Sequence, residues 1–587
     1  MTRSSLVDPD RYLGTITFVG ASAVRVNMPQ ATASPERRAL SRGVVGDFVF
    51  VDCELVKLLG RIVEAQIPDT ERLSVEPRLG IIPLTHPVGK IQLLASVDQR
   101  TNKLLRGLKE HPRIGDAVYL ADPTLLGDLF ANALNAEEEL TVAVGTLNAG
   151  SNVSLRLQPE RLFGRHCGIF GATGGGKSWT VASVINQIKE SGGKAILFDP
   201  TGEFSGMPAI SKHFAFDAEE VGATQVHFPY RKATEDDLFA LFRPGGQSQG
   251  PRLREAIRSL KLAEALKDVE GHGLTIIEGK IKKRGKPRAT YYAQQGAYRT
   301  LMHNPMCEFD ITNLPAQLTE ECVYGTDFNA QQNFGGVDQQ ALSHCESLIS
   351  RVRTLIHSAE LSGIFGTAGP SLSNILDDFI TKDDDDIIRI SFKNVRFDHN
   401  TREILMNVIG RYLLGRARGD AFRTRPMIVV LDEAHQFLGR TIGDEYVSVR
   451  LEAFGLIAKE GRKYGLTCVL ATQRPRDVPA DVLSQLGTFI VHRLTNEEDR
   501  QAVERACGDL DRNAALFIPT LAPGEAIIIG PGLPAPVPIL IHEPASPPNS
   551  KGPDYKTFWT SRKLAKTDRI AEEPKKAAST GGAAKSR

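Results

Sequence analysis

Residues 168–180 read GIFGATGGGKSWT, and this short stretch is the strongest constraint on the fold of the 587-residue chain. It matches the pattern G-x-x-x-x-G-K-[ST], in which Gly171 and Gly176 bracket a loop that Lys177 and Ser178 close. Such a loop connects a buried strand to the start of a helix, where backbone N–H groups can surround phosphates. We therefore predict an ATP and Mg²⁺ site whose nucleotide contacts come from Gly171, Thr173, Gly174, Gly175, Gly176, Lys177, Ser178 and Trp179.

A second stretch, MIVVLDEAH at residues 427–435, supplies two carboxylates. Five apolar residues form a buried strand that ends in Asp432 and Glu433. We predict that Asp432 and Ser178 hold Mg²⁺, that Lys177 neutralises the phosphates, and that Glu433 polarises the attacking water as general base. The alternative is a solvated acidic turn after a strand.

Two further residues are candidates for sensing the nucleotide. Gln473 ends the apolar strand TCVLATQ, where its amide could contact the γ-phosphate or the attacking water. Arg462 lies just before that strand at an expected helix end, although the helix dipole alone would also favour a cation there. We predict a catalytic role for both, with simple edge polarity as the alternative.

Arg165 stands at the start of the strand that leads into the loop. Five or six extended residues, at about 3.3 Å each, separate it from the phosphates bound by its own chain. We predict that it acts as an arginine finger on the nucleotide of a neighbouring subunit, or else forms a surface ion pair. The sequence leaves both possibilities open.

The pattern of apolar residues changes along the chain and defines the fold class. Up to residue 157, short alternating runs separated by Gly, Pro or Asp predict a small β-barrel. Apolar strands then alternate with helical stretches, which predicts an α/β fold with a RecA-like P-loop NTPase core of the ASCE type. The expected domains are a barrel at 1–157, a core at 158–217 and 379–545, a helical insertion at 218–378, and a C-terminal arm and disordered tail at 546–587.

Composition narrows the partners and the compartment. With 71 basic and 70 acidic side chains there is no overall field to attract nucleic acid, so DNA contacts would need local clusters of charge. The seven cysteines never occur as C-x-x-C, and no apolar run approaches the roughly 20 residues that span a bilayer. We expect a cytoplasmic protein without a zinc site, which also disfavours a membrane-bound secretion ATPase.

Three basic regions are candidates for DNA contact. In KIKKRGKPR, residues 280–288, six of nine residues are cationic, which suits contacts to phosphates without reading of bases. The others are the basic C-terminal tail and the set Arg416, Arg418, Arg423 and Arg425. A separate expectation concerns the turn FDPTGEF, where Asp199 and Glu203 are candidates for supporting catalysis or for simply forming a turn.

The tetrad at 432–435 spells DEAH, the motif of two-lobed superfamily 2 helicases. Those enzymes need a second lobe of domain size, but only about 150 residues follow Asp432, and several of their strands are needed to finish the first sheet. One lobe per chain remains, so we predict a closed ring with ATP between subunits.

The whole pattern resembles the HerA-type members of the HerA/FtsK family of ring-shaped DNA translocases. The similarity covers roughly residues 10–550 and lies in the barrel pattern and in the motifs RHCGIFGATGGGKS, DPTGEF, VVLDEAHQFL, EGRKYGL, ATQRP, VLSQLGTFIVHRLTNEEDR and LAPGEAIIIG. Two departures are Gly175 in the loop, where the family often has Ser, and Thr201, where the family often has His. Neither removes a phosphate ligand, but the second weakens the role expected of Glu203.

The resemblance implies a homohexamer that passes double-stranded DNA through a central pore. It also implies a separate effector, which we expect at the N-terminal barrel: a NurA-like nuclease in end resection, or a Sir2-like NADase or another nuclease in antiphage defence. An alternative is a scaffold whose ATP-bound ring assembles and activates an effector with little translocation.

Overall fold

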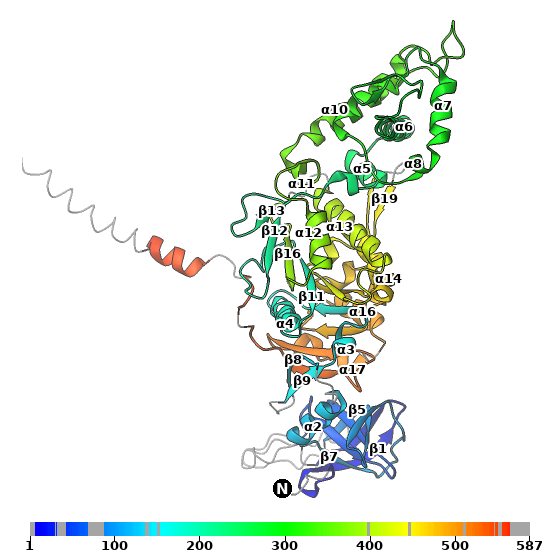
Figure 1. Cartoon of the computed structure of the whole chain (residues 1–587). Coiled ribbons are helices and arrows are strands. Elements are labelled where there is room, and N and C mark those ends of the chain that lie inside the picture. The colour runs from blue at the N-terminus through cyan, green and yellow to red at the C-terminus, as the bar shows by residue number, and fades with distance from the viewer. Residues whose placement is uncertain are drawn as a thin grey trace, which may run out of the picture.

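The computed structural model describes most of the chain and arranges it as an elongated molecule with the N-terminal barrel at one end and a helical lobe at the other (Figure 1). The described residues are 6–29, 31, 43–68, 87–134, 140–148, 153–384, 386–395, 400–443, 448–508, 512–544, 546–549 and 554–563. No helix in these ranges is both long and apolar enough to cross a membrane.

Six antiparallel strands close the N-terminal barrel, which confirms the predicted barrel. The strands follow the order β2-β1-β7-β3-β4-β5, and pairing between β5 and β2 closes the barrel. A seventh strand, β6, pairs with β5. Alternate residues of these strands point inward and form a separate apolar core around Leu13, Val49 and Ile91. The strands are β1 (Tyr12–Val19), β2 (Ala23–Asn27), β3 (Phe48–Asp52), β4 (Lys57–Gln66), β5 (Val88–Asp98), β6 (Lys103–Arg106) and β7 (Ala117–Leu120).

A sheet of twelve strands forms the middle of the molecule, in the order β13-β12-β16-β11-β17-β20-β10-β21-β22-β23-β8-β9. Strands β13 through β21 in that order are parallel, and the last four are antiparallel. The parallel strands are β10 (Cys167–Phe170), β11 (Lys194–Asp199), β12 (Lys212–Ala215), β13 (Thr224–Gln225), β16 (Ile387–Ser391), β17 (Met427–Leu431), β20 (Leu466–Thr472) and β21 (Thr488–Val491). The predicted RecA-like core is thereby confirmed, and β20 separates the strand of the glycine loop from the strand that leads to Asp432.

The domain boundary expected at residue 157 does not match the strand pairing. Strands β8 (Val142–Leu147) and β9 (Ser154–Leu157) fall inside the range predicted for the barrel, but β8 pairs with β23 (Val537–Leu540) of the large sheet. Strand β22 (Glu525–Ile529) joins this antiparallel group to β21. Alternation of apolar and polar residues predicts a strand but does not tell which sheet the strand joins.

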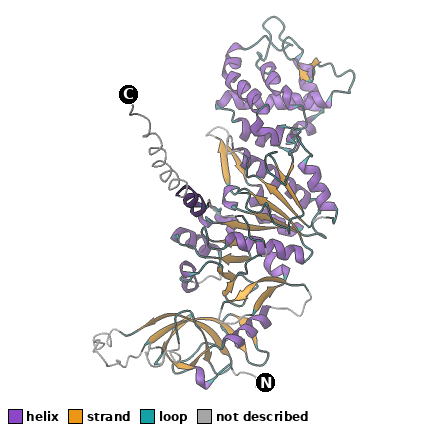
Figure 2. Ribbon diagram, turned by 90° about the vertical axis from the view of Figure 1, so that its left-hand side faces the viewer, coloured by secondary structure: helices purple, strands orange, loops and turns teal. Residues whose placement is uncertain are grey.

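Helices cover both faces of the large sheet (Figure 2). On one face α4 (Lys177–Glu190) packs Val181 and Ile185 against Ile169 of β10. On the other face Phe454 of α14 (Ala453–Glu460) meets Phe198 of β11, with ring centroids 5.5 Å apart. Helix α2 (Pro123–Leu134) lies between β6 of the barrel and β9 (Figure 1). The remaining helices around the sheet are α3 (Pro159–Phe163), α11 (Ser362–Phe365), α12 (Leu372–Thr381), α13 (Thr401–Arg418), α15 (Ala480–Leu483), α16 (Glu497–Ala506) and α17 (Arg512–Ala515), together with the hairpin β18 (Arg440–Gly443) and β19 (Ser448–Leu451).

The helical lobe is smaller than the insertion predicted at 218–378. Strand β13 belongs to the large sheet, and α12 lies beside that sheet, where Lys194 donates to the Phe379 carbonyl. The lobe itself comprises α5 (Glu235–Phe242), α6 (Gly246–Ala265), β14 (Ile276–Ile277), β15 (Lys280–Ile281), α7 (Arg288–Ala297), α8 (Arg299–His303), α9 (Leu314–Glu320) and α10 (Gln339–Ile356).

The predicted C-terminal tail lies mostly outside the described residues. A short helix at 555–563 is described, and residues 564–587 are not. The disorder and DNA contact predicted for the tail therefore stay predictions.

Candidate nucleotide site

The glycine loop lies between the carboxyl end of β10 and the start of α4, at the edge where all the neighbouring parallel strands also end. Gly176 takes φ +114°, which suits only glycine, and it is the N-cap of α4 without a side-chain cap. Gly171 must also be small, because a Cβ there would lie 2.8 Å from the Cβ of His492. The exposed backbone N–H groups at the start of α4, with the positive end of its dipole, make this turn a binding site for phosphate.

Lys177 binds both carboxylates that follow β17. Its Nζ lies 2.5 Å from Asp432 Oδ1 and 2.9 Å from Glu433 Oε1. All three side chains are buried, with 4% of the Lys177 side chain and 8% of the Glu433 side chain exposed. Residues 255 positions apart in sequence thus form one charged cluster.

Burial and charge act in opposite directions within this cluster. Burial raises the pKa of Asp432, whereas the Lys177 ammonium favours its carboxylate form. Burial also opposes the charge on Lys177, but the carboxylates of Asp432 and Glu433 raise its pKa. Because the charged atoms are in contact, the ion pair is the state that fits this geometry.

Gln473 positions Glu433. It follows β20, the strand between β10 and β17, and its Nε2 donates to Glu433 Oε1 at 2.9 Å. Its Oε1 accepts a hydrogen bond of 2.6 Å from the Thr173 hydroxyl at the exposed crest of the loop, next to Gly174. The loop, the sensor candidate and the general-base candidate are therefore directly connected.

Glu433 has a strained backbone. Its φ of 46° and ψ of 44° lie in the left-handed region, which costs a residue with a side chain about 1 kcal/mol or more. His435 lies beside it, with Nδ1 3.4 Å from Glu433 Oε2 and 2.9 Å from Thr472 Oγ1. These contacts hold the carboxylate at the edge of the sheet.

The residues predicted to hold Mg²⁺ fit that ion. Asp432 Oδ2 is buried and has no hydrogen-bond partner among the described residues, although Oδ1 of the same carboxylate is paired. Ser178 follows Lys177 at the first turn of α4 and is half-buried, as is Trp179. A carboxylate and a hydroxyl oxygen are ligands of the kind that Mg²⁺ takes. No cluster of three or more His, Cys, Asp or Glu side chains in the described part of the chain offers another metal site.

His492 is a site residue that the sequence reasoning missed. It follows β21, on the other side of β10, and its Nε2 lies 2.7 Å from the Thr180 hydroxyl of α4. Its Nδ1 lies 2.9 Å from the Glu525 carbonyl, and burial lowers its pKa to about 4, so the ring is neutral and donates to that carbonyl. The available signal was its place after a buried apolar strand, which also identified Asp432 and Gln473.

Arg165 and Arg462 lie at the opposite edge of the sheet. Both are exposed, and each stands before the amino end of its strand, β10 for Arg165 and β20 for Arg462. The stem of Arg165 lies across Gly487, which precedes β21. The structure does not bring either arginine to the nucleotide site of its own chain, although Arg462 was expected there as a sensor.

The turn after β11 is organised differently from the expectation. Asp199 Oδ2 accepts a hydrogen bond of 2.7 Å from Arg389 Nε, and Asp199 Oδ1 accepts one of 2.7 Å from the Gly202 N–H. Asp199 therefore forms its own turn and a buried ion pair, and the geometry does not favour the catalytic support predicted for it. The carbonyl of Glu203 accepts from the Asn549 N–H.

Carboxylates neutralise much of the predicted basic surface. In the segment 280–288, Lys280, Lys282 and Lys283 pair with Glu278, Glu320 and Glu321. The second basic set is paired throughout: Arg416 with Asp377, Arg418 with Glu460, Arg423 with Asp420, and Arg425 with Asp383. The structure therefore does not favour the second set as a DNA contact.

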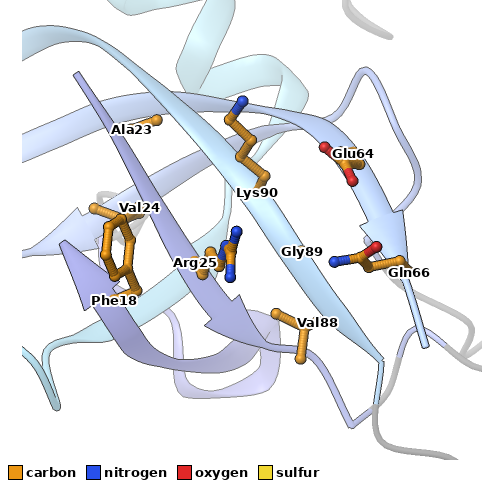
Figure 3. Close-up of a pocket in the computed structure, with 9 residues that line it drawn as sticks. All are labelled: Phe18, Ala23, Val24, Arg25, Glu64, Gln66, Val88, Gly89 and Lys90. Carbon is orange, nitrogen blue, oxygen red and sulfur yellow. The ribbon is translucent and has the colours of Figure 1, made fainter. Parts of the chain in front are cut away.

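The barrel wall carries a separate hollow of about 150 Å³ (Figure 3). Its lining includes Phe18 of β1, Arg25 of β2 and Lys90 of β5. The Arg25 guanidinium lies 5.5 Å from the centre of the Phe18 ring. This hollow belongs to the barrel and shares no residue with the nucleotide site.

A glycine loop, a buried lysine, two adjacent carboxylates and a polar residue on the intervening strand, all at the carboxyl edge of one parallel sheet, define a P-loop ATPase of the RecA-like class. The family described as "Helicase HerA, central domain" matches residues 142–320. The probable helicase MJ1565 of Methanocaldococcus jannaschii is 24% identical over 513 residues, which cover 84% of this chain and 85% of the relative. The DNA double-strand break repair helicase HerA of Pyrococcus furiosus is 22% identical over 458 residues, 73% of each chain.

The chain is therefore similar to HerA helicases along most of its length, as the sequence motifs predicted. Among solved structures, the conjugative coupling protein TrwB aligns with 73% of this chain and 94% of its own, at 14% identity and a TM-score of 0.42. A TrwB complex with ADP and Mg²⁺ aligns at 15% identity and a TM-score of 0.39, over 74% of this chain and 94% of its own.

Proposed function

We propose that the protein is a cytoplasmic, hexameric, ATP-dependent translocase of double-stranded DNA that works with a nuclease or NADase effector. The role is antiphage defence or the resection of DNA ends. Two findings support this: the HerA-type ATPase site, and relatives named as DNA double-strand break repair helicases.

In the proposed cycle, phosphate binding frees the general base. Lys177 pairs with both Asp432 and Glu433. Phosphates at the start of α4 would draw the ammonium away, which leaves Glu433 to accept a proton from the attacking water. The water oxygen then bonds to the γ-phosphorus, and the bond to ADP breaks. Bound Mg²⁺, held by Asp432 and Ser178, would balance the charge on the phosphates.

Gln473 would report the state of the nucleotide. It contacts both Thr173 in the loop and Glu433, so a change at the γ-phosphate position would alter the position of the base. This arrangement supports the sensor role predicted for Gln473.

The positions of Arg165 and Arg462 are the observation that supports a ring of subunits. Arg165 and Arg462 are exposed at the amino edge of the sheet, whereas the phosphates bind at the carboxyl edge. Arg462 also lines a groove of about 560 Å³ with Phe163, Ile188 and Ile428. In a ring with ATP at each interface, this edge would face the site of the neighbouring subunit and complete it.

Mixing inactive variants tests the ring. Glu433→Gln removes the base and Arg165→Ala removes the finger, so each homogeneous protein should be inactive. In mixed rings a Glu433→Gln subunit would still donate Arg165 to a partner whose own base is intact, and ATP hydrolysis should return. Glu433→Gln mixed with Lys177→Ala is the control without recovery, since neither fault can be repaired from the neighbour. Activity that stays absent in the first mixture would contradict the trans arrangement.

The alternative is a ring that assembles and activates an effector with little translocation. The closed barrel at the end of the molecule offers the surface for that effector (Figure 1). Full effector activation by a Lys177→Ala ring, which does not bind ATP, would leave scaffolding as the function.

A further inference from the structure

The far end of the helical lobe is built from three chain segments that lie side by side. Gly285 N donates to the Phe334 carbonyl at 3.0 Å, and Phe334 N donates to the Lys286 carbonyl at 2.9 Å. On the other side Gly335 N donates to the Tyr324 carbonyl at 2.9 Å, and Asp327 N donates to the Asn333 carbonyl. We call this surface, residues 284–288, 324–328 and 332–336, the lobe tip.

A buried polar network fixes the lobe tip from below. The buried Lys283 pairs with Glu321 and lies 4.0 Å from the centre of the Tyr291 ring. Glu321 also accepts from the Ser259 hydroxyl at 2.6 Å and from Gln317 Nε2 at 2.9 Å. Burying such an ion pair is costly and rarely stabilises a fold by itself, but it can impose one conformation on the segment that carries it. Here that segment is the one that continues into the lobe tip.

The fixed segment presents two cations without carboxylate partners. Arg284 and Lys286 are exposed, and within the described ranges neither has an ion-pair partner. The lysines just before them are all paired with glutamates. The available positive charge of the segment is therefore concentrated at the lobe tip.

Exposed aromatic rings lie on the same surface. Phe328 is 98% exposed, Tyr324 is 53% exposed and Tyr292 is 51% exposed. Tyr292 contacts Phe334 of the lobe tip, and the centroids of their rings are 6.0 Å apart. The backbone hydrogen bonds place the segment that carries Tyr324 and Phe328 on one side of residues 333–335 and the segment that carries Arg284 and Lys286 on the other.

We propose that the lobe tip is a binding site for single-stranded DNA, in which Arg284 and Lys286 contact phosphates and Tyr324 and Phe328 stack on unpaired bases. A basic track beside exposed aromatic rings is the combination that binds single strands without sequence preference. In a duplex the faces of the bases are covered by their neighbours, so the rings distinguish the two forms of DNA. The site goes beyond the proposed passage of duplex and does not depend on translocation.

Two double variants of the full chain test the site. Fluorescence anisotropy would measure binding of a labelled oligothymidine of about 20 nucleotides and of a duplex of similar length. Tyr324→Ala with Phe328→Ala should weaken oligothymidine binding about tenfold or more and leave duplex binding within twofold, given about 1–3 kcal/mol for each stacked base. Arg284→Gln with Lys286→Gln should lower the salt dependence of oligothymidine binding by a slope of about 1.4, for two phosphates.

A matched control comes from the barrel, where Phe18 and Arg25 form another exposed aromatic and cationic pair (Figure 3). Phe18→Ala with Arg25→Gln should leave oligothymidine binding unchanged. All the substituted side chains are exposed, so thermal unfolding and DNA-independent ATP hydrolysis should match wild type.

Oligothymidine binding within twofold of wild type in the aromatic variant would overturn the proposal. An equal loss of duplex binding would also overturn it, because it would show a general phosphate surface. If duplex DNA does not stimulate ATP hydrolysis by the wild-type protein, that result would instead contradict the proposed translocase.

Discussion

Lys177→Ala should destabilise the nucleotide-free protein, because it leaves two buried carboxylates without a counter-charge. Asp432 is fully buried and Glu433 nearly so, and Lys177 contacts both. Removing one partner from a buried ion pair costs about 3–5 kcal/mol. For a cooperative unit of roughly 150–250 residues each kcal/mol lowers the Tm by about 2–4 °C, so a fall of about 6–20 °C is expected.

Thermal unfolding without nucleotide measures this effect, and a second substitution tests its cause. Adding Asp432→Asn to Lys177→Ala removes one of the stranded charges and should restore at least half of the lost Tm. Lys459→Ala is the control, because Lys459 pairs with Asp481 at 2.7 Å but both side chains are exposed, and it should cost less than about 1 kcal/mol. An unchanged Tm in Lys177→Ala, or no recovery in the double variant, would show that the buried charges are not coupled as described.

Three further predictions concern the same sheet edge and two buried histidines, His166 before β10 and His492 after β21. Glu433→Gln should lower the rate of ATP hydrolysis about 10²–10⁴-fold, because it removes the general base. Nucleotide binding, measured by titration with a fluorescent ATP analogue, should persist. Loss of binding would instead show that Glu433 contributes to holding the nucleotide. Gln473→Ala should lower kcat more than it raises KM, since it removes the hydrogen bond that positions Glu433, and an effect on KM alone would contradict that role. Burial lowers the pKa of His166 and of His492 to about 4, below the value of 6.5 for an exposed histidine, so the unfolded chain binds protons first as the pH falls. Each histidine should contribute up to about 3 kcal/mol of stability above pH 6.5 that is lost between about pH 6.5 and pH 4, and a Tm without pH dependence in that window, or the same dependence in the His166→Gln and His492→Gln variants, would contradict this.

The parts of the site that the sequence predicted are those set by local patterns. The loop from Gly171 to Ser178 has a fixed spacing, and Asp432 and Gln473 each follow a buried apolar strand. Parallel strands place their carboxyl ends at one edge, so the convergence of these residues followed from the strand pattern alone.

The remaining parts depend on pairing between distant segments. β8 joins β23 almost 400 positions later, and Asp199 is neutralised by Arg389, 190 positions away. Local periodicity carries no information about such partners, which is why the barrel boundary and the role of Asp199 differed from expectation. The same reason applies to the basic segment 280–288, where Lys282 and Lys283 are neutralised by Glu320 and Glu321, 38 positions further on.

Displacement of a third strand from a triplex on duplex DNA tests most directly whether ATP hydrolysis at this site drives movement along DNA. Wild-type protein with ATP and Mg²⁺ should displace the third strand, and Glu433→Gln, which still binds ATP, should not. Hydrolysis of ATP by the wild type without any displacement would contradict translocation and favour the scaffold.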